Sequence, residues 1–224
     1  MNRVLVVAAH PDDETLGCGG TLLKHKSQGD EIYWLLLTGP KIDVPEEQVD
    51  EKIRFRRGLM QTINEAYHFD GTEYLALPPA CVHSVDLKEL VGTISDVFKR
   101  VTPNIIYTMF ANDVHSDHRV AFDAVYSCTK SFRYPFIEKI YMMEALSETE
   151  FALAIPSNTF IPNVYVDITN FMDQKLAIMS KYTKQIMESP YPRSLSSIEA
   201  LARLRGSRAG VMYAEAFQLL FEKR

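Results

Sequence analysis

Short apolar runs alternate along the chain with longer amphipathic segments. The first run, 4–9, is continuous and rich in β-branched residues, as is typical of a strand buried on both faces. In 84–101 the apolar residues recur at steps of one and three, which indicates a helix with one face against a sheet. By these criteria we expect strands at 4–9, 32–37, 104–108, 140–143 and 163–167, and helices at 12–28, 45–64, 84–101, 117–131, 171–188 and from 196 onward.

The order of these segments predicts the fold class. Strand, helix and strand follow one another from the start of the chain, and Gly29 is a good C-cap between the first helix and the second strand. Ser196 and Glu199 form an S-x-x-E capping box, while 189–193, with two prolines, is the one stretch typical of an irregular linker. We therefore predict a single α/β domain over 1–224, with a mostly parallel sheet flanked by helices and a C-terminal elaboration.

Composition excludes several classes of protein. The 224 residues are 46% hydrophobic and 24% charged, which is globular composition and excludes disorder over most of the chain. Twenty-four basic residues against 29 acidic ones give a net charge of -5, so nucleic acid is not an expected partner.

Cysteine usage and hydropathy predict where the protein resides. Its three cysteines are far apart and form neither a disulfide framework nor a zinc ribbon, which favours reduced thiols in a cytosol. No stretch approaches the ~18 apolar residues of a membrane span, and the first apolar run ends too early for a signal peptide. We expect a soluble cytoplasmic protein.

Two clusters of polar residues follow predicted strands. The sequence reads His10-Pro11-Asp12-Asp13-Glu14 after the first strand and His115-Ser116-Asp117-His118 after the strand ending near 108. Ligands of open α/β sheets bind at the carboxyl ends of strands, so both clusters are candidates for one site. Imidazoles plus a carboxylate suit Zn²⁺ with an open position, which is the arrangement of catalytic zinc.

The spacing of these residues suggests which of them bind the metal and which act as acid or base. If His10 and Asp13 take the metal, Asp12 is left beside it as a general base. In the second cluster one histidine can ligate while the other meets a carbonyl oxygen of the substrate, and Asp117 could orient or charge His115.

The same residues carry a resemblance to a known family. VVAAHPDDETLGCGG at 6–20, together with HSDHR at 115–119, resembles the PIG-L/LmbE family of zinc-dependent sugar de-N-acetylases. The resemblance implies a Rossmann-like α/β fold, homo-oligomers such as trimers or hexamers, and removal of the N-acetyl group from a small GlcNAc-like sugar conjugate. Matched position by position, it implies that the metal ligands are His10, Asp13 and His118, the base is Asp12, and the oxyanion-stabilising or proton-donating pair is His115 with Asp117.

Several alternatives stay open. The protein could be a catalytically silent sugar- or metal-binding member of the same fold, although the unligated carboxylate of Asp12 favours an enzyme. A two-metal phosphoesterase would need a bridging carboxylate, for which Glu14 is the sole nearby candidate. The glycines at 17, 19 and 20 favour close helix packing over a phosphate loop. The aglycone is open, as is contact of substrate with Arg54, Arg56, Arg57 or Arg193.

Overall fold

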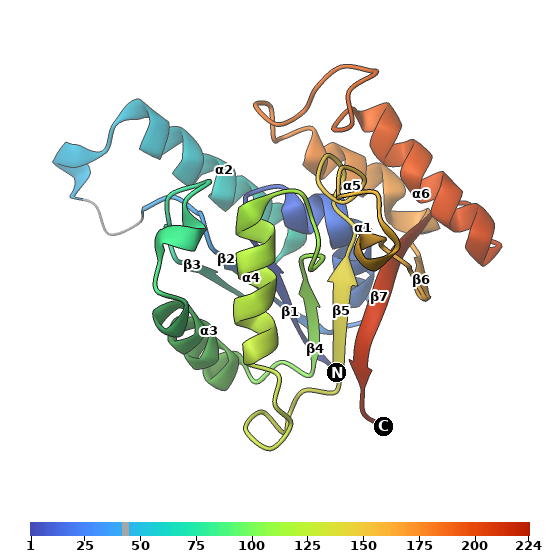
Figure 1. Cartoon of the computed structure of the whole chain (residues 1–224). Helices are drawn as coiled ribbons and strands as arrows, with labels where there is room; N and C mark the ends of the chain where they lie inside the picture. Colours follow the sequence, from blue (N-terminus) through green and yellow to red (C-terminus); the bar gives the residue numbers. More distant parts are fainter. Residues whose placement is uncertain (42–44) are drawn as a thin grey trace.

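The chain is built on one sheet of seven strands in the order β3-β2-β1-β4-β5-β7-β6 (Figure 1). The computed structural model describes residues 1–41 and 45–224. The strands are β1 Arg3–Ala8, β2 Glu31–Leu36, β3 Gly71–Tyr74, β4 Ile105–Thr108, β5 Lys139–Met143, β6 Val164–Asp167 and β7 Ala214–Glu222. Strands β1 to β5 pair in parallel, whereas β7 runs antiparallel to both β5 and β6. The predicted mostly parallel α/β sheet is confirmed.

Helices cover both faces of this sheet. They are α1 Asp13–Ser27, α2 Glu51–Tyr67, α3 Leu87–Val101, α4 Ser116–Ser127, α5 Met172–Met179 and α6 Leu195–Ala209, with short 3-10 turns at Glu46–Gln48, Val82–Ser84, Pro156–Asn158 and Thr169–Phe171. α1 packs with α2 and α5 on one face, α3 packs with α4 on the other, and α6 lies against β6 and β7. Within 1–41 and 45–224, no helix is both long and apolar enough to cross a membrane.

The C-terminal third departs from the predicted elements. β7 was not predicted there, and neither, earlier in the chain, was β3. α5 ends at Met179 rather than continuing to 188, because the chain turns to bury the ring of Tyr182 against α1. The capping box at 196–199 is also wrong: Ser194 caps α6 by accepting a hydrogen bond from the backbone N–H of Ser197 at 3.2 Å.

Other deviations lie around α2 and α4. The helix predicted at 45–64 is interrupted, since the side chain of Asp50 caps a new helix at Glu51; 42–44 lie outside the described residues. The helix predicted at 117–131 begins one residue earlier and ends at Ser127.

The glycine-rich start of α1 serves packing, as predicted. A Cβ added at Gly17 would lie 2.6 Å from Sδ of Met143, and one at Gly20 would lie 2.8 Å from the side chain of Ile168. Both distances are shorter than van der Waals contact allows, so glycine lets α1 approach β5 and the chain after β6. Cys18 is fully buried in the same helix.

Candidate active site

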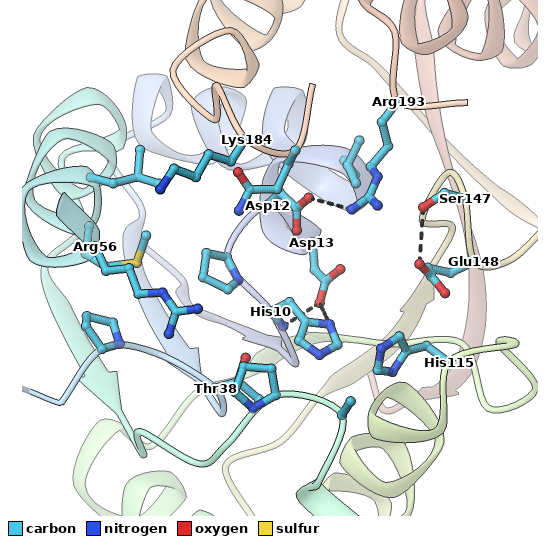
Figure 2. A pocket seen from close by; sticks show the side chains of 18 of the residues that line it. His10, Asp12, Asp13, Thr38, Arg56, His115, Ser147, Glu148, Lys184 and Arg193 are labelled. Atoms are coloured by element: carbon cyan, nitrogen blue, oxygen red, sulfur yellow. Dashed lines mark hydrogen bonds and ion pairs between the residues drawn. The ribbon is translucent and has the colours of Figure 1, made fainter. Parts of the chain in front are cut away.

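A cavity of about 400 Å³ opens at the carboxyl ends of β1 and β4 (Figure 2). These two strands are parallel neighbours, so the segments that follow them meet at one edge of the sheet. We call residues 10–13 and 113–118 the floor of this cavity. Both clusters found in the sequence therefore lie together, although they are separated by more than 100 residues.

Three floor side chains converge on one point. Nδ1 of His10 lies 3.3 Å from Nε2 of His118, and the carboxylate of Asp13 lies 3.8 Å from the first atom and 3.4 Å from the second. Their ligand atoms all lie within 4.8 Å of one another. These are the three residues expected to bind a metal.

The outward nitrogens of both rings are held by carboxylates. Nδ1 of His118 lies 2.8 Å from Oδ2 of Asp113, and Nε2 of His10 lies 3.0 Å from Oδ2 of Asp117. We assign the ring N–H groups to these outward positions, because a carboxylate can only accept. The lone pairs of Nδ1 of His10 and Nε2 of His118 then face each other, an arrangement that requires a positive charge between them.

Electrostatics favour such a charge. Burial by itself lowers the pKa of His118, but the carboxylates of Asp13 and Asp113 outweigh it and raise the pKa to about 10. Burial raises the pKa of Asp13, but His118 and His10 lower it to about 2. The cluster therefore holds a proton, and a bound metal ion would take the place of that proton. Two histidine nitrogens and one carboxylate oxygen, with each histidine supported by a second carboxylate, fit a divalent ion such as zinc.

Asp113 is a functional candidate that sequence reasoning missed. It is fully buried, its other oxygen accepts a hydrogen bond from the Thr149 hydroxyl at 2.7 Å, and burial raises its pKa. The available signal was an acidic residue in the polar loop five positions before His118. Spacing alone does not reveal that the loop turns this carboxylate back onto the ring.

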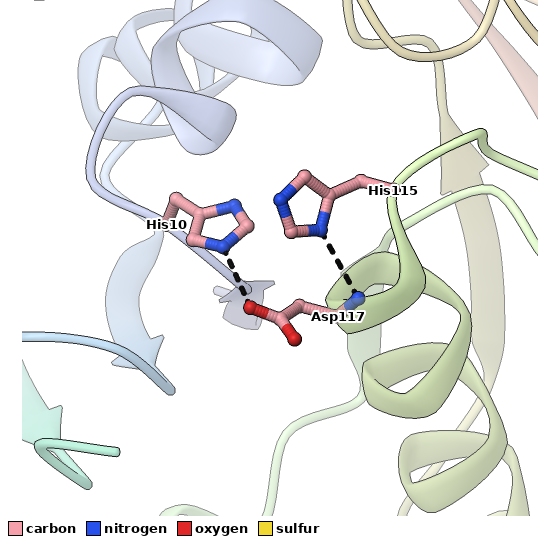
Figure 3. A group of neighbouring side chains, drawn as sticks. All are labelled: His10, His115 and Asp117. Carbon is pink, nitrogen blue, oxygen red and sulfur yellow. Dashed lines mark hydrogen bonds and ion pairs between the residues drawn. The ribbon is translucent and has the colours of Figure 1, made fainter. Parts of the chain in front are cut away.

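The carboxylate of Asp117 contacts His10, whereas the contact of Asp117 with His115 is made by its backbone N–H. Oδ2 of Asp117 lies 3.0 Å from Nε2 of His10 (Figure 3). The same carboxylate accepts hydrogen bonds from the backbone N–H groups of Ala80 at 2.7 Å and Val82 at 3.0 Å. Burial raises the pKa of Asp117, but these hydrogen bonds lower it overall. The segment after β3, which the sequence did not place, thus directs Asp117 toward His10. His10, His115 and Asp117 form a second possible metal group, but both oxygens of Asp117 are already engaged.

His115 is held as a hydrogen-bond donor toward the cavity. It is the N-cap of α4, and its Nδ1 accepts the backbone N–H of Asp117 at 3.1 Å, so the ring proton of the neutral form sits on Nε2. Burial and the neighbouring His10 and His118 lower the pKa of His115. The negative charge of Asp117 opposes this lowering of the His115 pKa but does not reverse it.

Asp12 belongs to neither possible metal group and faces the cavity. Its backbone has φ 118° and ψ -26°, a conformation that a non-glycine residue rarely adopts, and its side chain is buried. Burial and the nearby Asp13 raise the pKa of Asp12, while Arg193, whose Nη1 lies 3.2 Å from Oδ2, opposes that shift. Arg193, whose contact with substrate the sequence left open, therefore pairs with Asp12.

Glu14 does not reach the cavity, and its Oε2 accepts a hydrogen bond from the backbone N–H of Asp12 at 3.3 Å. Its Oε1 accepts hydrogen bonds from the hydroxyls of Thr15 at 2.6 Å and Tyr182 at 2.5 Å, and burial raises its pKa to about 7. Glu14 does not line the cavity and belongs to neither possible metal group in the described residues. The bridging carboxylate required by a two-metal phosphoesterase is therefore missing from the position where the sequence offered it.

Residues of α2 and of 184–193 also line the cavity. Of the three arginines in α2 considered from the sequence, Arg56 lines the cavity, whereas Arg57 donates to the backbone oxygen of Lys41 at 3.0 Å and Arg54 is outside the lining. We call Lys52, Arg56 and Lys184 the cationic wall; all three line the cavity.

Other proteins of known structure have the same fold. The conserved protein TT1542 from Thermus thermophilus has a TM-score of 0.77 and 25% identity, over 100% of this chain and 97% of that one. GalB, the 4-carboxy-2-hydroxymuconate hydratase of Pseudomonas putida KT2440, has a TM-score of 0.75 and 19% identity, over 100% and 98% of the two chains. A hydratase thus shares the architecture, so the fold alone does not identify the reaction.

Comparisons of sequence are more specific. Diacetylchitobiose deacetylase of Thermococcus kodakarensis is 23% identical over 223 residues, which cover 98% of this chain and 84% of the relative. The sequence model of the GlcNAc-PI de-N-acetylase family, PIG-L, matches residues 5–129, which include both floor clusters. The resemblance noted in the two motifs is confirmed: this chain is a member of the PIG-L family, and its relatives include sugar N-deacetylases.

Proposed function

We propose that this protein is a zinc-dependent hydrolase that removes the N-acetyl group from a GlcNAc-like sugar conjugate. The observation that carries the proposal is the position of Asp12, a buried carboxylate that faces the cavity beside the possible metal group without belonging to it. A site that only bound metal or sugar would have no use for a carboxylate in that position.

The metal would be held by His10, Asp13 and His118. Asp113 and Asp117 would fix the two imidazoles from behind, which supports the ligands in orientation and basicity. When bound, zinc supplies Lewis-acid chemistry, polarising the acetamide carbonyl and making water a nucleophile near neutral pH.

The chain itself supplies the proton transfers. Asp12 accepts a proton from the attacking water, aided by burial that raises its pKa, and passes that proton to the departing sugar nitrogen. Nε2–H of His115 donates a hydrogen bond to the acetamide oxygen as negative charge develops on it. Water adds to the carbonyl carbon, the C–N bond breaks, and acetate and a free amine leave.

The deciding experiment measures both products. Purified protein loaded with zinc should release acetate and free amine in equal amounts from N-acetylglucosamine glycosides or from N,N'-diacetylchitobiose. Chelator-treated protein and the double variant His10→Ala, His118→Ala serve as controls and should release neither. A zinc-loaded protein that binds these sugars without releasing acetate would instead support the silent binding protein.

A further inference from the structure

Positive charge gathers on one side of a cavity in an acidic protein. The chain carries a net charge of -5, yet Lys52, Arg56 and Lys184 all line the cavity. Arg56 and Lys184 lie on the side away from His115 (Figure 2). Within the described residues, none of the three forms an ion pair or a hydrogen bond with another side chain. Their charges therefore remain available to a ligand.

The remaining cation of the cavity is different. Arg193 already pairs with Asp12 at 3.2 Å, so its charge is largely balanced within the protein. The carboxylates that line the cavity, Asp12, Asp13 and Glu148, belong to the floor or its border beside His115. The cavity thus has an acidic, histidine-rich floor and a cationic wall.

The cationic wall joins two elements that are distant in sequence. Arg56 projects from α2, while Lys184 follows α5, and Nζ of Lys184 lies 4.3 Å from the centre of the Phe55 ring. A cation placed over an aromatic face is attracted to the ring, so this contact holds the ammonium group beside α2. Lys184 and Arg56 thus line the same cavity although they come from two different elements.

We propose that the substrate carries a phosphate ester which the cationic wall binds while the acetamide lies on the floor. This inference rests on the proposed deacetylase function and adds the class of substrate. An arginine presents a planar fork of donors to phosphate oxygens, and lysines supply additional point charges. Three cations match the two negative charges of a phosphate monoester, or those of a diphosphate, better than the single charge of a carboxylate. A cavity of about 400 Å³ is within the size range of small-molecule sites.

Binding tests the wall separately from hydrolysis. Calorimetry on chelator-treated protein compares N-acetylglucosamine 1-phosphate and 6-phosphate with the neutral methyl glycoside of N-acetylglucosamine. We expect at least one phosphate to bind about 10-fold more tightly than the neutral sugar, with an advantage that shrinks as salt rises. Arg56→Gln and Lys184→Gln should each reduce that advantage several-fold. Lys88→Gln, which removes an equal charge from exposed α3, should leave it unchanged.

The outcomes separate the two proposals. Equal binding of phosphate and neutral sugars, or an advantage that survives both wall substitutions, would overturn the phosphate site. Tighter binding of N-acetylmuramic acid than of either phosphate would replace the phosphate by a carboxylate and also overturn it. In the zinc-loaded protein, acetate release without any preference for phosphorylated sugars would contradict only the proposal that the cationic wall binds phosphate. A wall-dependent phosphate preference without acetate release would contradict the deacetylase function alone.

Discussion

The floor and the cationic wall of the cavity are built in opposite ways. Floor residues come from two short segments at adjacent strand ends, and the carboxylates of Asp113 and Asp117 are buried with their oxygens satisfied. Wall residues come from α2 and from the segment after α5, are partly or fully exposed, and leave their charges available. A preorganised floor suits the hydrolysis step, which is the same for every N-acetyl sugar. The exposed wall contacts the part of the substrate that differs from one sugar conjugate to another. Changes to the floor should therefore affect all N-acetyl sugars, while changes to the wall should affect only some.

The largest expected effect comes from removing a floor ligand. We expect the His118→Ala variant to lose zinc and to release acetate about 10⁴-fold more slowly, or worse, with every sugar tested. The substitution removes one metal ligand together with the contact between that ligand and Asp113. Metal analysis and an acetate assay measure the two effects. His83→Ala, at an exposed histidine, is the control. Full zinc content in His118→Ala would refute the ligand assignment.

Removing the base should separate metal binding from chemistry. Asp12→Asn should keep zinc and lose about 10²- to 10⁴-fold in turnover, because an amide cannot accept the proton of water. Measuring zinc content and kcat on the same preparation checks both parts. Turnover equal to that of the wild type would eliminate Asp12 as the base.

Loss of the cavity-facing imidazole should have the next largest effect. His115→Asn can still cap α4 but removes the Nε2 donor, so we expect zinc to be retained and kcat to fall about 10²- to 10³-fold. Helix content measured by circular dichroism checks the cap. If zinc were lost with His115, the second possible metal group would have to replace the first.

The support behind the metal ligands should matter less. Asp113→Ala should weaken zinc binding about 10- to 100-fold, because His118 loses the acceptor that orients its ring. Zinc competition with a chromophoric chelator measures this affinity. Asp123→Ala, at an exposed position of α4, is the matched control. Equal affinities in the two variants would show that Asp113 has no such role.

The smallest effect is expected from changing Arg193, which pairs with Asp12 of the floor. Arg193 opposes the raised pKa of Asp12, so Arg193→Gln should raise that pKa further. Because the base must be deprotonated, the acidic limb of the pH–rate profile should move to higher pH. At neutral pH the loss should be about five-fold or less. Arg193→Lys should restore part of the shift, and an unmoved limb would exclude this electrostatic role.

The sequence by itself determined the parallel half of the fold and the floor. Continuous apolar runs and a helical period predict β1, α1, β2, α3 and β4, because burial on both faces of a parallel sheet leaves a direct trace in local sequence. The two His/Asp clusters were found for a related reason. In such sheets chemistry gathers at strand ends, and β1 and β4 are strand neighbours.

Tertiary structure alone decided the partnerships of these residues. The carboxylate of Asp117 contacts His10 rather than His115, Asp113 supports His118, and Arg193 reaches Asp12 across 181 positions of chain. The pairing of β7 with β5 and β6 was likewise decided only by the fold. A periodic pattern reports which face of an element is buried, but not which distant side chain it meets. The direction of a carboxylate depends on backbone N–H groups and rings that only the folded chain brings within hydrogen-bond distance.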